Sequence, residues 1–388
     1  MRTPLVFGRF MLPRGGVSDV WPCIACDQYT SRPDYWNEEY LRAGDSPSAL
    51  RLICPEAFLS DAGKYIDGIS AHSRAYARDV LEEYRGAVLV ERSVAGGVRY
   101  GLVCLADLEE YDYAGGTGLI RATEGTVAER IPPRLAVREA SALDVSHVIC
   151  LIDDESGSVI EPLIGSGEPL YDIALPRGGR LRGSLIADTS SVAGALNALF
   201  SRAVAEGRPA VLVGDGNHSL AAAKALYEKY KAEGDARASS ARYALVEVEN
   251  VRSGGVRFLP IHRVVYGSPG IAEKLSLLGG SGSVSLVRGC SSVRVPAPAD
   301  PAEAYAAVQA VIDASGARTD YIHGDGEIMR ICAEDADAVG VLMPPLAKDG
   351  LFGYIASHGV LPRKSFSLGE AEDKRYYVEC RLVDDKGI

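Results

Sequence analysis

Short apolar runs and helical apolar faces follow one another along the chain. Residues 209–213 are apolar and predict a buried strand, while residues 218–232 place Ala222, Leu226 and Tyr230 on one helical face. Two apolar segments, 87–94 and 98–106, flank a glycine-rich turn and predict a hairpin. Because strands and helices alternate in this way, we expect a mixed α/β fold.

Four further segments complete the expected architecture. Residues 47–85 have helical patterning that ends at Gly86, and residues 190–207 predict a second helix ending in a glycine. Residues 120–140 are expected to form an arginine-rich loop, and residues 256–267 a strand. We expect an N-terminal α/β region over 1–155 and a second α/β region over 156–388.

Composition narrows the class of protein. The 388 residues carry a formal net charge of −11, which argues against a general nucleic-acid binder. No apolar run approaches the roughly 18 residues of a membrane span. The eight cysteines lie mostly in apolar runs, and a single C-x-x-C pair at 23–26 is too little for zinc. We expect a cytoplasmic protein without zinc or haem, whose oligomeric state the sequence leaves open.

The clearest candidate site is the sequence GDGNHS at 214–219, between the strand and the helix. The first N–H groups of a helix have no acceptor within it, and the helix dipole adds positive charge there. Glycines let an anion approach the backbone, so the junction suits a phosphate. Asp215 could bind magnesium or orient a hydroxyl, and His218 could donate to a phosphate or act as acid and base.

A purely structural explanation fits the same residues. Asp215 and Gly216 can form a turn, Asn217 can cap the helix, and His218 can lie on the surface. The spacing matches neither a Walker A loop nor a dinucleotide-binding fingerprint.

Several segments resemble one known family. "DGNHSLAAA" resembles the D-G-H-H-R-x-x-A-A signature of a family catalogued as a domain of unknown function, number 1015. "FLPIHRVV", "GVLMPP" with "GVLPRKSFSLGEAEDKRYYVECRLV", and "CDQYTSRPDYW" resemble other segments of that family, in the same order. The family name implies no activity.

The motif also resembles that of the ParB/sulfiredoxin-like superfamily, over about ten residues. That superfamily includes free-serine kinases, CTP-binding partition proteins and sulfiredoxins. The resemblance implies a core in which a strand–loop–helix junction handles phosphates. This chain has Asn217 and Ser219 where the motif has His and Arg. The missing arginine removes a strong phosphate ligand, so another basic residue must replace it or the activity is lost.

Other basic residues could supply that charge. The prolines in "ERIPPR" suggest a stiff, extended segment that presents Arg130 and Arg134, although a solvated loop with internal salt bridges is the alternative. His262 and Arg263 point to opposite faces of a strand, so one of them could line a pocket. The segment 363–375 gathers further basic and hydroxyl residues, including Lys374. The candidate ligand-binding residues are Gly214, Gly216, Asn217, Ser219, Arg121, Glu124, Arg130, Arg134, His262, Arg263, Arg363, Lys364 and Ser365.

Together these features favour a nucleotide-using, small-molecule phosphotransferase of serine-kinase type, with ADP, ATP or CTP and magnesium as expected cofactors. Asp215, His218 and Asp27 are the candidate catalytic residues, and Asp215 is the candidate magnesium ligand. One alternative is a nucleotide or phospho-metabolite binding module without turnover. A ParB-like nucleic-acid-associated protein is a further alternative that the acidic charge disfavours.

Overall fold

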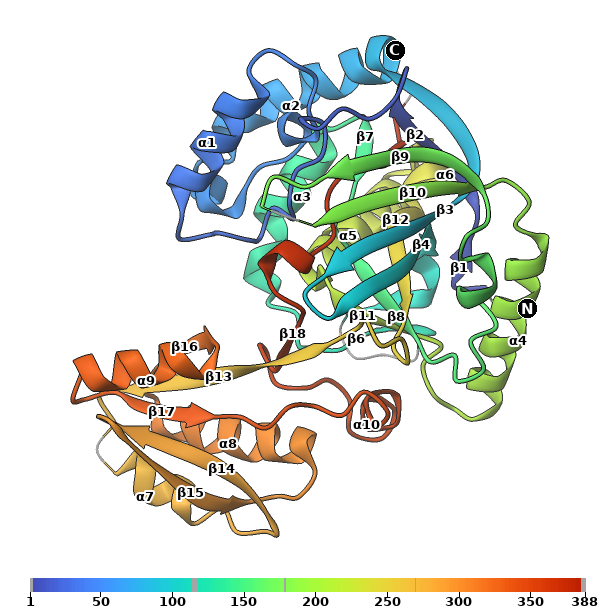
Figure 1. Ribbon diagram of the computed structural model, residues 1–388. Helices are drawn as coiled ribbons and strands as arrows, with labels where there is room; N and C mark the ends of the chain where they lie inside the picture. The colour runs from blue at the N-terminus through green and yellow to red at the C-terminus, as the bar shows by residue number, and fades with distance from the viewer. Residues whose placement is uncertain (1–2, 114–117, 178, 269, 385–388) are drawn as a thin grey trace. The chain divides into compact units, whose positions relative to one another are not determined.

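The computed structural model describes residues 3–113, 118–177, 179–268 and 270–384, and it divides into two compact units. The first unit comprises Met1–Ala122, Thr126–Val256 and Gly369–Ile388, and the second comprises Thr123–Gly125 and Arg257–Leu368. The division differs from the expected boundary at residue 155, because the chain returns to the first unit after residue 368 and completes its sheet there (Figure 1).

The first unit contains a mixed 13-stranded sheet with the path β5-β6-β11-β8-β12-β4-β3-β2-β19-β7. Its strands are β1 (Leu5–Val6), β2 (Gly8–Pro13), β3 (Leu81–Val94), β4 (Gly97–Asp107), β5 (Tyr111–Asp112), β6 (Ile120–Ala122), β7 (Leu143–Val145), β8 (Ile149–Ile152), β9 (Glu168–Ala174), β10 (Arg180–Ile186), β11 (Val211–Asp215), β12 (Tyr243–Asn250) and β19 (Cys380–Leu382). Its helices are α1 (Pro33–Ala43), α2 (Gly63–Ala75), α3 (Ile131–Ala140), α4 (Ser190–Ala205), α5 (Asn217–Glu233) and α6 (Ala238–Ala241). The mixed α/β fold is confirmed.

Two hydrophobic cores lie on opposite faces of this sheet. On β4, Leu102 and Cys104 contribute to the core that includes α4 and α5, while Val103 and Leu105 contribute to the other. This is the alternation that a strand with two buried faces requires. The sheet is therefore covered on both sides, and polar groups on its central strands must find partners within the protein.

The second unit contains a six-stranded antiparallel sheet with the path β15-β14-β17-β13-β16, and β18 pairs with β13. Its strands are β13 (Phe258–Tyr266), β14 (Gly282–Arg288), β15 (Ser291–Ala297), β16 (Arg318–His323), β17 (Val339–Leu342) and β18 (Phe366–Leu368). Its helices are α7 (Ile271–Ser276), α8 (Pro301–Ser315), α9 (Asp325–Glu334) and α10 (Leu351–His358).

Two segments of the first unit differ from the elements predicted for them. The helix expected to end at Gly86 ends at Ala75, where a π-helical turn leads to Leu81 and β3 begins. Residues 81–86 become a strand because they pair with β2, a tertiary contact that local patterning does not contain. The expected loop 120–140 instead contains β6 and α3, with its two prolines in the first helical turn, where proline is tolerated.

Charged residues are fully buried against the second face of the sheet. Glu247 accepts from Arg92 and Arg375 at 2.8 Å each, and Arg375 also contacts Glu379 at 3.0 Å. All four side chains are 1 % exposed. Burial alone would raise the pKa of Glu247, but the guanidinium groups of Arg92 and Arg375 lower it to about 2. Each buried charge therefore depends on its partners.

We predict that Glu247→Gln destabilises the first unit by about 3–5 kcal/mol at neutral pH, because it leaves two guanidinium groups buried without their shared carboxylate. The pKa of Glu247 is lower in the folded chain than the ordinary 4.5. The difference from wild type should therefore be complete above pH 4.5 and shrink as the pH falls towards 2.

Urea unfolding followed by tryptophan fluorescence measures this difference, because both tryptophans, Trp21 and Trp36, lie in the first unit. Glu83→Gln, at an exposed pair with Arg9 in the same unit, is the matched control and should leave stability unchanged. An equal and small loss in both variants would show that the buried network does not stabilise the unit.

Candidate functional site

The strand β11 ends in a bulge directly before α5. The register of β11 with β8 shifts between Val213 and Asp215, which makes Gly214 the extra residue. Gly216 is the N-cap of α5 and lies in the left-handed region, with φ 76°. The expected strand, glycine turn and helix are confirmed, although the cap is Gly216 and not Asn217. A glycine cap leaves the start of α5 without a side-chain cap.

Gly216 lies tightly against the segment before β8. A Cβ atom at this position would be 3.0 Å from Val148 Cα and 3.3 Å from His147 Cδ2. The absence of a side chain at Gly216 therefore allows His147, which is 4 % exposed, to approach the start of α5.

Asp215 forms an ion pair with a buried lysine. Its Oδ2 lies 3.3 Å from Nζ of Lys374, whose side chain is 5 % exposed, and its Oδ1 accepts from the backbone N–H of Gly216. Lys374 comes from the C-terminal segment, 159 residues further along the chain. A lysine therefore provides positive charge beside the motif whose Arg is replaced by Ser219.

The side chains of Asn217 and His218 contact neighbouring segments. Asn217 accepts from Tyr111 Oη at 2.8 Å and donates to Thr126 Oγ1 at 2.8 Å. His218 Nε2 accepts from the Val127 N–H at 3.1 Å, which places the proton of the neutral ring on Nδ1. These bonds fasten the residues before α3 to the start of α5.

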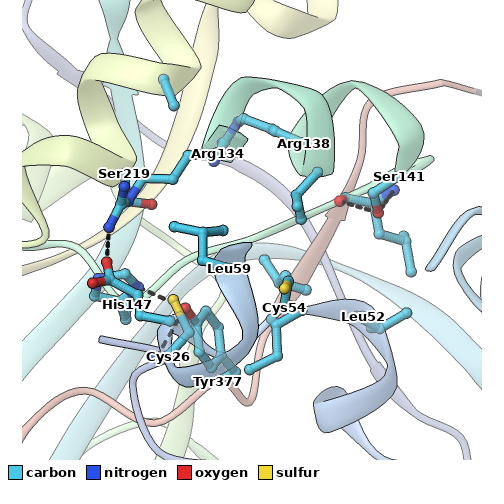
Figure 2. A pocket seen from close by; sticks show the side chains of 16 residues that line it. Cys26, Leu52, Cys54, Leu59, Arg134, Arg138, Ser141, His147, Ser219 and Tyr377 are labelled. Carbon is cyan, nitrogen blue, oxygen red and sulfur yellow. Dashed lines mark hydrogen bonds and ion pairs between the residues drawn. The ribbon is translucent and has the colours of Figure 1, made fainter. Parts of the chain in front are cut away.

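A pocket in the first unit opens beside this junction, with about 630 Å³ of empty space that continues into solvent. Figure 2 shows Ser219, His147, Cys26 and Tyr377 towards one end, and Leu52 and Ser141 towards the other. The lining residues are Cys26, Leu52, Ile53, Cys54, Glu56, Leu59, Arg134, Val137, Arg138, Ser141, Leu143, Val145, His147, Ser219, Ala222 and Tyr377.

Two of the predicted arginines lie one helical turn apart at the start of α3. Arg134 lines the pocket and forms an ion pair with Glu56, and Arg130 lies 3.4 Å from the same carboxylate. The two arginines carry one more positive charge than Glu56 neutralises. The expected extended presentation is wrong, because Arg134 lies within a helix and Arg130 is its N-cap.

His147 and Tyr377, which line the pocket, form a row of polar groups with Asp27 of the N-terminal segment. His147 Nδ1 lies 2.6 Å from Tyr377 Oη, and His147 Nε2 lies 3.8 Å from Asp27 Oδ1. The Asp27 side chain is 28 % exposed, so it remains accessible to solvent. Burial and the neighbouring Asp27 raise the pKa of Cys26 to about 12, which makes Cys26 a poor nucleophile.

Both carboxylate oxygens of Asp215 already have partners within the protein. Lys374 already pairs with one carboxylate oxygen, and the other accepts from the backbone. Within the described residues no group of three or more His, Cys, Asp or Glu side chains is placed to hold a metal ion.

The remaining candidates hold together parts of the fold. Arg121 lies on β6 and donates to the Gly118 carbonyl at 3.2 Å, and it does not line the pocket. In the second unit, Glu124 accepts from the backbone N–H groups of Lys364 and Ser365 at 2.7 and 2.9 Å. The Ser365 hydroxyl donates to the Pro362 carbonyl. These bonds stabilise the turn in which Lys364 has a positive φ of 57°.

Arg263 and His262 also stabilise the second unit. Arg263 is 0 % exposed, lies over the rings of Tyr305 and Tyr321, and donates to the Lys364 carbonyl at 3.0 Å. His262 is bonded at both ring nitrogens, by Asp325 and by the Met343 N–H.

Arg363 is exposed and donates to Tyr321 Oη. Because the second-unit contacts described above lie within one unit, we build the site from the first unit alone.

The family model titled "Protein of unknown function (DUF1015)" matches residues 11–280, which is 270 of the 388 residues. The chain belongs to this family. Its matched region includes Asp27, His147 and the GDGNHS motif of the site. No curated protein matches the chain.

Three solved structures are similar at a distance, each aligned with 71 % of this chain at 11 % identity. They are a C-terminally truncated SbnI from Staphylococcus aureus (82 % of that chain, TM-score 0.38), a free serine kinase variant in complex with ADP (87 %, 0.38) and a conserved hypothetical protein from Pyrococcus furiosus (90 %, 0.35). Likeness at this level supports no inference about this chain.

We predict that Gly216→Ala costs more stability than Gly234→Ala at the other end of α5. Both glycines are left-handed, which costs any other residue about 1–2 kcal/mol. Only at Gly216 would the new Cβ contact backbone, so that variant should lose at least about 1 kcal/mol more. Urea unfolding of both variants measures the difference, and equal losses would contradict the close approach of His147.

Proposed function

We propose that the first unit binds a phosphorylated small molecule at the start of α5. The observation that carries the proposal is the buried Lys374 paired with Asp215, directly beside a glycine-capped helix start. Helix N-termini favour anions, and a lysine adds a compact positive charge that phosphate oxygens can share.

The pocket supports the same assignment. Ser219, in the first turn of α5, and Arg134 both line it, so a hydroxyl group and a guanidinium group lie at one end. The protein as a whole carries a charge of −11, and a local excess of positive charge is therefore needed to retain an anion. The resemblance of GDGNHS to a phosphate-handling motif agrees with this arrangement.

We predict that Lys374→Met weakens the binding of AMP about 10- to 100-fold, since a hydrogen bond to a charged group contributes about 1.5–3 kcal/mol. Titration calorimetry of the full chain measures the dissociation constant, with inorganic phosphate and ADP as further ligands, each with and without magnesium. Malonate serves as the non-phosphate anion.

Two further variants show whether a loss of binding results only from a loss of folding. Lys374→Met with Asp215→Asn removes both charges of the pair. It should still bind AMP more weakly than wild type, by a smaller factor than Lys374→Met alone because the repelling carboxylate is gone, and with less loss of stability. Lys229→Met removes a lysine of α5 that forms an exposed ion pair with Glu139, and this variant should bind AMP as wild type does. An unchanged affinity for AMP in both Lys374 variants would overturn the assignment of this lysine to a phosphate site.

A second candidate function, phosphoryl transfer to a hydroxyl, is favoured by the row of Asp27, His147 and Tyr377. In such a reaction the acceptor oxygen forms a bond to phosphorus, the bond to the leaving phosphate breaks, and the hydroxyl proton passes to a base. Asp27 is the partly exposed carboxylate of the row, and His147 contacts it from the buried side.

We predict that Asp27→Asn lowers kcat about 10²- to 10⁴-fold while the dissociation constant for the nucleotide stays within about twofold. The assay follows nucleotide consumption with a panel of small hydroxyl compounds as acceptors. Asp61→Asn, at an exposed aspartate of the same unit, is the control. Equal turnover in Asp27→Asn and wild type would remove Asp27 as the base.

A further inference from the structure

The pocket changes character along its length. At the end near α5 it has Ser219, Arg134, His147 and Tyr377, which can donate hydrogen bonds, and Glu56, whose carboxylate pairs with Arg134. The rest of the lining is mostly aliphatic: Leu52, Ile53, Leu59, Val137, Leu143 and Val145. A ligand that fills this pocket therefore needs one anionic end and a body that tolerates apolar contact.

The polar groups at the far end are already paired within the protein. Arg138 forms an ion pair with Asp144, which is 0 % exposed, and the Ser141 hydroxyl donates to the Leu143 carbonyl at 2.8 Å while accepting from the Leu143 N–H. The far end thus adds no uncompensated charge. A ligand body with several hydroxyl groups would lose hydrogen bonds to water here, at about 1–3 kcal/mol for each group left unpaired.

The pocket also has the form of a slot. Figure 2 shows Arg134 and Arg138 of α3 on one side, with Leu59 and Cys54 facing them across the space. A ligand with a flat ring can contact both walls of such a slot at once. A ligand with a polar chain would lose its hydrogen bonds to water if it did the same.

We infer that the ligand is a nucleoside phosphate whose uncharged, aromatic base lies between α3 and the segment 52–59, with its phosphate at the start of α5. This inference rests on the proposed function and adds the class of the ligand's body to it. It distinguishes a nucleotide from a sugar phosphate or free phosphate at the same anion site.

The test compares AMP, ribose 5-phosphate, hexyl phosphate and inorganic phosphate by titration calorimetry of the full chain. AMP should bind at least tenfold more tightly than ribose 5-phosphate, which has the same phosphate and sugar without the base. Hexyl phosphate, which is apolar but not flat, should bind more weakly than AMP.

Two variants test where the base of the ligand lies. Val137→Trp fills the slot with an uncharged side chain and should remove the advantage of AMP over ribose 5-phosphate, while inorganic phosphate binds as before. Ala136→Trp, on the exposed side of the same helix, should leave all four affinities unchanged. Retention of the AMP advantage in Val137→Trp would overturn the placement of the base.

The outcomes separate the two proposals. Equal binding of AMP, ribose 5-phosphate and inorganic phosphate would overturn the nucleoside assignment and leave the phosphate site standing. Equal binding of hexyl phosphate and AMP would show an apolar site without preference for a base, which also overturns the inference. Failure of all four compounds to bind would overturn the phosphate site itself, and the inference with it.

Discussion

The site depends on a set of buried arginines that hold the segment 373–375 against the sheet. Arg92 donates to the Lys374 carbonyl at 2.9 Å, and Arg99 donates to the Asp373 carbonyl. Arg375 donates to the carbonyl of Ser146, the residue before His147, at 2.9 Å. The same interactions thus fix Lys374 beside Asp215 and hold the segment that carries His147.

The buried charges around the candidate site are paired with opposite charges. The guanidinium groups of Arg92 and Arg375 are neutralised by Glu247 and Glu379, so the network adds little net charge to the site. Their contribution is geometric, because their hydrogen bonds to the carbonyls of Lys374 and Ser146 hold the backbone in place. Lys374 forms an ion pair with Asp215, whose other carboxylate oxygen accepts from the N–H of Gly216.

Local patterns predicted the parts of the fold that short-range physics decides. The β3–β4 hairpin, the helix α4 and the β11–α5 junction all follow from apolar periodicity and glycine positions. Residues 81–86 were not predicted as a strand, because the local pattern does not contain their pairing with β2. The helix α3 was not predicted either, because its two prolines suggested an extended segment, although proline is tolerated in a first helical turn.

The candidate site shows the same division. GDGNHS, Asp27 and Arg134 carry recognisable chemistry and were named from the sequence alone. His147 and Tyr377 were not selected, since six histidines offer no way to choose a partner without tertiary contacts. Lys374 stood out only as a member of a basic segment, and its pairing with Asp215 spans 159 residues. Long-range pairs of this kind leave no periodic trace in one sequence.

The return of the chain after residue 368 has a consequence for biosynthesis. The strand β19 pairs with both β2 and β7, and Lys374 and Arg375 precede it by only a few residues. A nascent chain that has emerged through residue 368 therefore contains the whole of the second unit but lacks the last parts of the first. Because domains generally fold as units during synthesis, the inserted unit can be complete while the first unit still lacks Lys374 and Tyr377. Translation that stops at this point would yield a chain with a complete second unit and a first unit that lacks β19.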